Sequence, residues 1–288
     1  MSNLLPVYDI KNLHLSKEGF LVSEFEPYLK RHQKLLQPHG HSFYHIGFFT
    51  QASGGHVIDF KKFDVLPNQI YFLTPGQFHQ WDFKGKVEGY VLNFNQDFFQ
   101  SFLHQADYLE SFPFFEGDAK NSVINLPVAV SNSLAALFLE MLDLNDHLER
   151  KDTDHFRVVA LKLFFTVGRF VAKKSGVKSA TVHNSLIRDF KRLIEKDFKS
   201  TRLPKDYASA LNITSNYLNA VCNKVLGQSA GELIRNRVIL ESKRLLVNNT
   251  LTISQIAYEL NFTDNAYFSK FFRKYAGINP EDFRKSYY

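Results

Sequence analysis

The spacing of apolar residues divides the chain into a strand-rich part and a helical part. Between residues 20 and 99, short apolar runs alternate with turn residues, which is typical of a small β-barrel or jelly roll. After residue 95 the apolar positions recur every three or four residues, which predicts amphipathic helices. We expect strands at residues 45–50, 56–60, 70–73 and 88–94, a turn at 53–55, and helices at 96–109, 128–148, 154–173, 184–199 and 231–248.

The helical pattern near the C-terminus occurs twice. Residues 251–283 hold two short amphipathic helices around a break, and residues 207–227 repeat this pattern. Asn212 in the first copy matches Asn261 in the second at an offset of 49 residues. The helix expected at 231–248 would hold the two copies at a fixed separation, as a protein that reads successive major-groove faces of DNA requires.

The second helix of each copy has one apolar face that we expect to be buried. In the first copy this face comprises Leu218, Val221, Cys222 and Val225. In the second copy it comprises Phe268, Phe271, Phe272 and Tyr275. Truncating a core aromatic residue costs roughly 3–5 kcal/mol, so Phe271→Ala is expected to unfold the second copy.

This double unit resembles the DNA-binding region of the AraC/XylS family of bacterial transcription regulators, in which a long helix joins two helix-turn-helix units. The family signature in the second unit runs from an Ile-Ala pair to a Gly-x-x-Pro and a Phe-Arg pair. In this chain the signature is present as Ile256-Ala257, Gly277, Pro280 and Phe283-Arg284. Asn261 stands where the family usually has glycine, and because asparagine tolerates a left-handed backbone we expect the turn to be preserved.

Small, hydrogen-bonding and cationic side chains lie opposite the two apolar faces, as in helices that enter a major groove. The candidate DNA contacts are Ser215, Asn216, Asn219, Ala220, Asn223 and Lys224 in the first unit, and Asp264, Asn265, Ala266, Ser269, Lys270, Arg273 and Lys274 in the second. We expect Arg273 and Lys270 to contact guanine or phosphate and the asparagines of the first unit to select bases. Lys224 and Lys274 are expected to contact the DNA backbone. The alternative interpretation is that these asparagines are solvent-exposed residues with no role in DNA binding.

Charge supports a nucleic-acid partner for the C-terminal part. The chain carries a net charge of +6, and residues 183–288 have 17 Lys and Arg against 10 Asp and Glu. The basic surplus therefore lies with the double unit, where it would meet phosphates.

Cysteine content and hydropathy indicate the cellular compartment of the protein. Cys222 is the only cysteine, so no disulfide can form within the chain, and this agrees with a reducing compartment. The first 20 residues lack the order of a signal peptide, and no uninterrupted apolar run approaches the ~20 residues of a membrane span. We expect a cytoplasmic protein that does not enter a membrane.

The strand-rich part resembles the cupin-like sensor domain found at the front of many members of this family. The segments that carry this resemblance are His39-Gly40-His41 and Thr74-Pro75-Gly76-Gln77-Phe78-His79. The resemblance implies a barrel that binds an organic effector at its mouth. The candidate effector contacts are His41, Tyr44, His45, His79 and Trp81.

A metal site in this barrel is an alternative use of its histidines. Cupin metal sites combine His-x-His with a carboxylate and a later histidine, and the matching candidates are His39, His41, His45 and His79. His45 stands where the carboxylate would be, and the family's sensor barrels mostly work without metal. We therefore expect neither a bound metal nor a cofactor.

The two resemblances together imply an α+β multidomain chain with four segments. These are a cupin-like effector-binding barrel at residues 1–105, a helical dimerisation or packing segment at 106–175, a linker at 176–183 and an all-α double helix-turn-helix domain at 184–288. A homodimer formed through residues 128–173 and contact with RNA polymerase are further implications of the family resemblance.

The function predicted from the sequence is transcription regulation by sequence-specific binding to promoter DNA, under control of a small-molecule effector and without enzymatic activity. One alternative is a metal-dependent cupin enzyme with a DNA-binding appendage. Another is an effector-independent regulator whose barrel binds no small molecule and only mediates dimerisation. DNA alkylation repair is excluded, because that chemistry needs an exposed nucleophilic cysteine and Cys222 is predicted to be buried.

Overall fold

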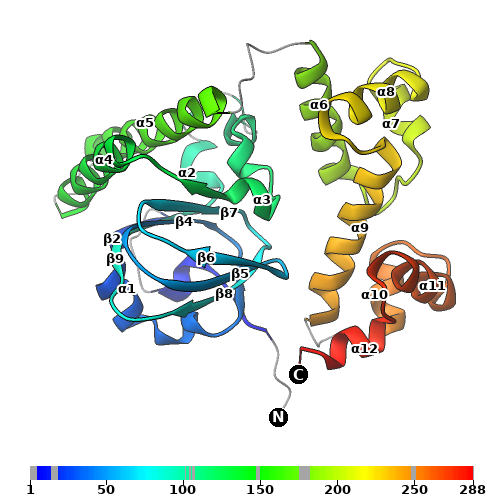
Figure 1. Cartoon of the computed structure of the whole chain (residues 1–288), viewed down its shortest axis with the longest axis horizontal. Helices are drawn as coiled ribbons and strands as arrows, with labels where there is room; N and C mark the ends of the chain where they lie inside the picture. Colours follow the sequence, from blue (N-terminus) through cyan, green and yellow to red (C-terminus); the bar gives the residue numbers. More distant parts are fainter. Residues whose placement is uncertain are drawn as a thin grey trace. The chain divides into compact units, whose positions relative to one another are not determined.

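The computed structural model describes residues 5–13, 19–100, 102–103, 105, 108–146, 150–174, 182–247 and 251–287. The described residues form two compact units, one within residues 6–174 and one within residues 182–287 (Figure 1). Residues 176–181 of the predicted linker lie outside the described residues, and residues 182 and 183 belong to the first helix of the C-terminal unit.

The N-terminal unit is built on two five-stranded sheets. One sheet has the order β1 (Val7–Tyr8), β3 (His39–His41), β8 (Phe78–Phe83), β5 (Gly54–Ile58) and β6 (Lys61–Val65). The other has the order β10 (Val123–Asn125), β7 (Gln69–Leu73), β4 (Tyr44–Gln51), β9 (Glu88–Phe94) and β2 (Phe20–Glu24). The β-barrel predicted from the short apolar runs is thus confirmed, and β4, β7 and β9 match three of the expected strands.

Two details of the strand prediction are wrong. Strand β5 begins at Gly54, inside the turn expected at residues 53–55, and Gly54 and Gly55 pair with Val65 and Asp64 in β6. The segment 106–175 is not wholly helical, because β10 lies within it and pairs with β7.

Alternation along the strands creates two cores. Side chains that point between the sheets, such as Phe49, Tyr71 and Trp81, form one core with Phe25 of helix α1 (Phe25–Arg31). Side chains on the other face of the β10–β7–β4–β9–β2 sheet, such as Phe48, pack against two long helices (Figure 1). Both faces of this sheet are therefore buried.

The two long helices are α4 (Val128–Asp146) and α5 (Arg150–Lys174), which pack against each other and confirm the helices expected at 128–148 and 154–173. By length and composition alone α4 could cross a membrane, with a mean hydropathy of 1.2. Its side chains Leu134, Phe138 and Met141 are instead fully buried in the sheet–helix core. Packing within the unit accounts for this stripe of α4, whereas Val128 and Leu139 of the same helix remain exposed.

The helix expected at residues 96–109 is wrong. Among the residues of this range that the structure describes, α2 (Asp97–Gln100) is the only α-helix, and a 3-10 turn, η3 (Tyr108–Ser111), follows it. Phe98 and Phe99 of α2 and Leu109 of η3 all pack in the core between the sheet and the long helices. The apolar positions of this range therefore reach the core from two short elements, which helical spacing in the sequence does not distinguish from one continuous helix. The remaining short elements of this unit are η1 (Ile10–Leu13), η2 (Gln33–Leu36), η4 (Pro113–Phe115) and α3 (Ala119–Ser122).

The C-terminal unit is entirely helical in its described residues. Its helices are α6 (Val182–Asp197), α7 (Pro204–Ala210), α8 (Ser215–Leu226), α9 (Ala230–Val247), α10 (Ile253–Glu259), α11 (Asn265–Ala276) and α12 (Pro280–Lys285). The pairs α7–α8 and α10–α11 are the two predicted copies, and α9 is the predicted connecting helix (Figure 1).

Candidate DNA interface and barrel site

The turns of the two helix-turn-helix units have the same backbone conformation. Asn212 and Asn261 both adopt a left-handed conformation, with φ of +54° and +55°. This confirms that asparagine can replace glycine in the turn, since it is among the few side chains that tolerate this region. Gly227 and Gly277 end α8 and α11, also with positive φ, as left-handed helix C-caps do.

The second helix of each unit, α8 or α11, begins with a side-chain cap. The backbone N–H of Tyr217 donates to Thr214 Oγ1 at 3.2 Å. In the second unit the N–H of Tyr267 donates to Asp264 Oδ1 at 2.7 Å. These caps satisfy N–H groups that the first helical turn leaves free, so the start of each helix is fixed.

The buried faces of these helices are narrower than the apolar stripes predicted. Phe268 and Phe272 are fully buried, but Phe271 is only half-buried. Val225 and Tyr275, at equivalent positions in the last turns of α8 and α11, are 37% and 42% exposed. The prediction that Phe271, Val225 and Tyr275 belong to the core is therefore wrong. The neighbouring helices cover only part of each apolar stripe.

The signature pair Phe283-Arg284 joins α12 to the rest of the unit. The Phe283 ring packs against Phe272 with centroids 5.5 Å apart. The Arg284 guanidinium donates to the carbonyl oxygens of Leu246 at 3.2 Å and Leu251 at 2.7 Å. Arg284 thereby satisfies a carbonyl that the C-terminal turn of α9 leaves free.

Arg202 makes a second link, which the sequence pattern did not reveal. Its guanidinium lies 3.9 Å from the centre of the Phe262 ring and donates a hydrogen bond to the carbonyl oxygen of Leu260. This contact ties the segment between α6 and α7 to the turn of the second helix-turn-helix unit.

Most candidate DNA contacts are on the solvent-facing sides of α8 and α11. The exposed candidates are Asn216, Ala220, Asn223, Lys224, Asp264, Asn265, Ala266, Lys270, Arg273 and Lys274, whereas Ser215, Asn219 and Ser269 are half-buried. Lys270 and Arg273 form no ion pair with another described residue. Their charges are therefore available to a partner.

Some of these side chains already hold structural hydrogen bonds. Asn219 Oδ1 accepts from the N–H of Ala230 at 3.0 Å, at the start of α9. Asn265 Nδ2 donates to Ser254 Oγ at 3.0 Å, which joins α11 to α10. Tyr217 and Tyr267, which were not among the predicted contacts, are 42% and 57% exposed in the first turns of α8 and α11. Their match at an offset of 50 residues was the signal that could have indicated them.

The barrel interior contains a cluster of histidines. His39 and His41 lie on β3, His45 on β4, His56 on β5 and His79 on β8, and each is at most 3% exposed. Burial lowers the pKa of His39 to about 4 and that of His45 to about 3, and it lowers the pKa values of the other three as well. All five are therefore neutral at pH 7. His56 was not among the predicted site residues.

Tyr44, a predicted effector contact, lies apart from this cluster. It precedes His45 on β4, so the two side chains point to opposite faces of the sheet. Tyr44 stacks on Phe94 with ring centroids 5.0 Å apart, in the core beneath α4 and α5. Trp81 does join the cluster, because its ring stacks on His56 at 3.3 Å between centroids.

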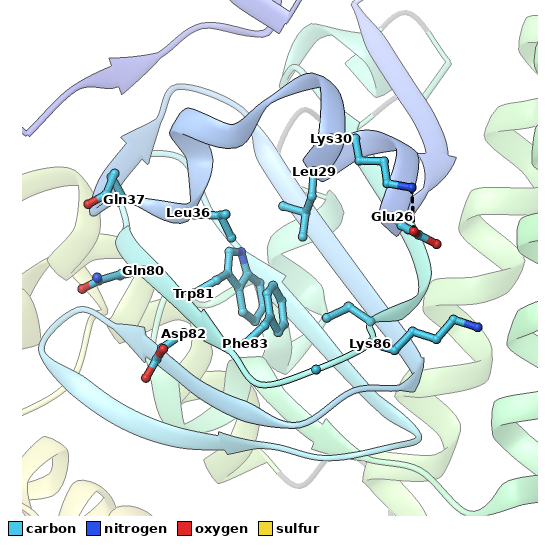
Figure 2. Close-up of a pocket in the computed structure, with 12 residues that line it drawn as sticks. Glu26, Leu29, Lys30, Leu36, Gln37, Gln80, Trp81, Asp82, Phe83 and Lys86 are labelled. Atoms are coloured by element: carbon cyan, nitrogen blue, oxygen red, sulfur yellow. Dashed lines mark ion pairs between the residues drawn. The ribbon is translucent and has the colours of Figure 1, made fainter.

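A pocket of about 490 Å³ lies beside the cluster, between the α1–η2 segment and β8 (Figure 2). Figure 2 shows Trp81 and Phe83 from β8 extending towards Leu29 and Leu36. Charged groups stand at its edge, where Glu26 and Lys30 form an ion pair of 2.7 Å. The pocket offers an apolar wall with polar groups at its rim, as sites for organic ligands do.

The chain matches two family models, whose descriptions are a helix-turn-helix domain at residues 207–286 and an AraC-like ligand binding domain at residues 24–155. A search of curated proteins finds the Msm operon regulatory protein of Streptococcus mutans, 32% identical over 34% of this chain and 36% of its own length. It also finds the HTH-type transcriptional activator AarP of Providencia stuartii, 30% identical over 38% of this chain and 81% of its own length.

The chain spans 33–40% of the length of the first curated relatives it matches. Among solved structures, fatty-acid-bound ToxT of Vibrio cholerae is similar, with 16% identity, coverage of 94% of this chain and 96% of that one, and a TM-score of 0.43. The two family models, the identity with AarP and the paired helix-turn-helix units lead to one conclusion. The chain belongs to the AraC/XylS family of transcription regulators.

Proposed function

We propose that this protein is a sequence-specific, DNA-binding transcription regulator whose activity depends on a small molecule bound by the barrel. The observation that carries this proposal is the pair of matching helix-turn-helix units, each with a capped recognition helix whose outer face is exposed. Promoter DNA is the proposed partner, with α8 and α11 in adjacent turns of the major groove.

The second unit supplies the cations of the proposed interface. Lys270 and Arg273 are exposed on α11 and lack an ion pair within the described part of the chain, which suits contact with guanine or phosphate. Lys274 is also exposed and is assigned to the DNA backbone. Exposed Tyr217 and Tyr267 can donate their hydroxyl groups to phosphates at the starts of the two recognition helices.

The first unit offers amide side chains for base selection. Asn216 and Asn223 are exposed on α8, and an asparagine amide can pair with adenine through N6 and N7. Asn219 is assigned a positioning role instead, because its oxygen already accepts from the backbone of Ala230.

The proposed effector is an organic molecule with an apolar body, bound in the pocket of Figure 2. Leu29, Leu36, Trp81 and Phe83 would contact this body. The buried histidines would support Trp81 from behind, since His56 stacks directly on its ring. Among the predicted contacts only Trp81 lines this pocket, and Tyr44 would take no part.

We further propose a cytoplasmic homodimer that acts on RNA polymerase without catalysing a reaction itself. The exposed apolar side chains of α4 and α5, which include Leu139 and Phe165 at 55% and 47% exposure, support pairing of two copies. Cys222 is fully buried, and burial raises its pKa to about 11, so it is unsuited to nucleophilic chemistry.

The experiment that tests this proposal is selection of genomic DNA fragments by the purified full chain, followed by sequencing. We expect enrichment of sites with two short motifs about one helical turn apart. The control is an Arg273→Ala and Asn223→Ala double variant, which should fold but enrich far less. Absence of any enriched motif, with the barrel pocket empty or filled by candidate ligands, would contradict the proposed function.

A further inference from the structure

We infer that the barrel interior holds one divalent transition-metal ion, ligated by His39, His41 and His79. One ring nitrogen from each of these residues lies within 4.8 Å of the others, and all three side chains are buried. This site goes beyond the proposed function and does not depend on DNA binding.

The hydrogen bonds of the cluster are incomplete. His41 Nε2 lies 2.7 Å from His79 Nε2, and His79 Nδ1 lies 2.9 Å from His56 Nε2. His41, His79 and His56 thus form a row of three neutral imidazoles, with His79 in the middle. The row carries three N–H groups but forms only two mutual hydrogen bonds. His41 Nδ1 and His56 Nδ1, at the two ends of the row, are buried without a partner. One buried N–H is therefore always unsatisfied, whichever tautomers are chosen, and such a group costs free energy.

An ion would use the nitrogens that now face one another. His39 Nδ1 bonds to the carbonyl oxygen of Gln37 at 2.8 Å, so this nitrogen carries the proton and Nε2 has a free lone pair. His79 can likewise donate from Nδ1 to His56 Nε2, which frees its Nε2 towards His41. Ligating histidines usually donate their second nitrogen in this way, so Gln37 and His56 are positioning groups for the metal site.

The ligand set selects the class of ion. Neutral imidazoles suit Zn²⁺, Co²⁺, Ni²⁺ and Cu²⁺, whereas Mg²⁺ and Ca²⁺ prefer oxygen ligands. Because none of the three imidazoles carries charge, the ion would bring a positive charge into a buried site. An anion such as hydroxide is expected to complete its coordination.

His45 is equally buried, but only its Nδ1 has a partner, and its Nε2 is buried without one. Its Nδ1 lies 2.8 Å from Asn93 Oδ1, and Asn93 donates in turn to the Tyr28 hydroxyl at 3.2 Å. It is not part of the convergent set, so of the four residues indicated by sequence three remain as ligands. Because its ring nitrogens lie outside the convergent set, His45 serves as the comparison for a buried histidine of the same cluster.

The test uses the untagged full chain, unfolded with a chelator and refolded with Co²⁺ or Zn²⁺. We expect one ion per chain by elemental analysis. Trp81 is the only tryptophan of the chain, and its ring centroid lies 5.7 Å from that of His79. Co²⁺ in the site should therefore quench most tryptophan emission, which Co²⁺ on distant surface histidines should not do.

Variants separate ligands from neighbours. His41→Gln and His79→Gln should lose the bound ion and the quenching, whereas His45→Gln should keep both. His56→Gln should weaken metal affinity about 10–100-fold, as removal of a second-shell partner does. Wild-type protein that takes up no ion, or quenching that persists in His79→Gln, would overturn the inference. If a ligand variant fails to fold by circular dichroism, the wild-type stoichiometry and Trp81 quenching decide the outcome.

Discussion

At the scale of single residues, hydrogen bonding decides which polar side chains remain available to DNA. A helical wheel assigns Asn216, Asn219 and Asn223 to the same outer face of α8. In the fold, Asn219 turns its oxygen to the start of α9, a contact that joins residues 11 positions apart. The periodicity of one helix contains no information on such a partner, so it predicted the exposure of Asn216 and Asn223 but not the hydrogen bond of Asn219.

Arg273→Ala tests base reading. If the guanidinium contacts guanine, its loss should cost about 1–3 kcal/mol in binding to the selected site and relax the preference at that base. Fluorescence anisotropy with matched and single-mismatch duplexes measures both effects. Lys274→Ala is the control, and it should weaken binding to all duplexes about equally. An equal loss across all duplexes for Arg273→Ala would exclude its reading of a base.

At the scale of elements, the sequence predicted where helices and strands lie more reliably than which side chains they bury. The bounds of α8 and β9 follow directly from caps, glycines and apolar spacing. Which side chains of α11 are buried depends on how much of the helix α9, α10 and α12 cover, and this is determined by tertiary packing. The same limit applies to His56, whose place beside His79 depends on the pairing of β5 with β8.

Phe272→Ala and Phe271→Ala form a matched pair of substitutions on α11. Phe272 is fully buried, so its truncation should destabilise the C-terminal unit by roughly 3–5 kcal/mol. Phe271 is half-buried and should cost clearly less. Urea unfolding of the full chain, followed by circular dichroism, measures the difference. Equal losses would contradict the observed burial.

The histidines of the barrel make its stability sensitive to acid. Burial lowers the pKa of His45 to about 3, whereas an unfolded chain protonates histidine near its ordinary value of about 6.5. The unfolded state therefore binds more protons between these values. The resulting stability is fully present above pH 6.5 and is lost as the pH falls towards 3.

Urea unfolding monitored by Trp81 fluorescence, with chelator present, measures this effect. The midpoint should fall as the pH is lowered from 7 to 5, and His45→Gln should reduce the slope of this dependence. A midpoint that does not change over this range would contradict the assignment of neutral, buried histidines.

At the scale of the whole molecule, the chain separates a strand-rich unit from a basic helical unit. The sequence indicated this division through the change from alternating to helical periodicity and through the placement of positive charge. It did not locate the pocket, because Leu29, Leu36 and Trp81 converge only when α1, η2 and β8 pack together. Residues that meet through topology are not neighbours in any sequence pattern.

The most direct measurement of the central claim is DNA selection repeated with two single variants, Asn223→Ala in α8 and Arg273→Ala in α11. If both helices read DNA, each variant should lose sequence preference in a different one of two motifs about one helical turn apart. Loss in the same motif, or no change in either, would contradict the account of two recognition helices in adjacent major grooves.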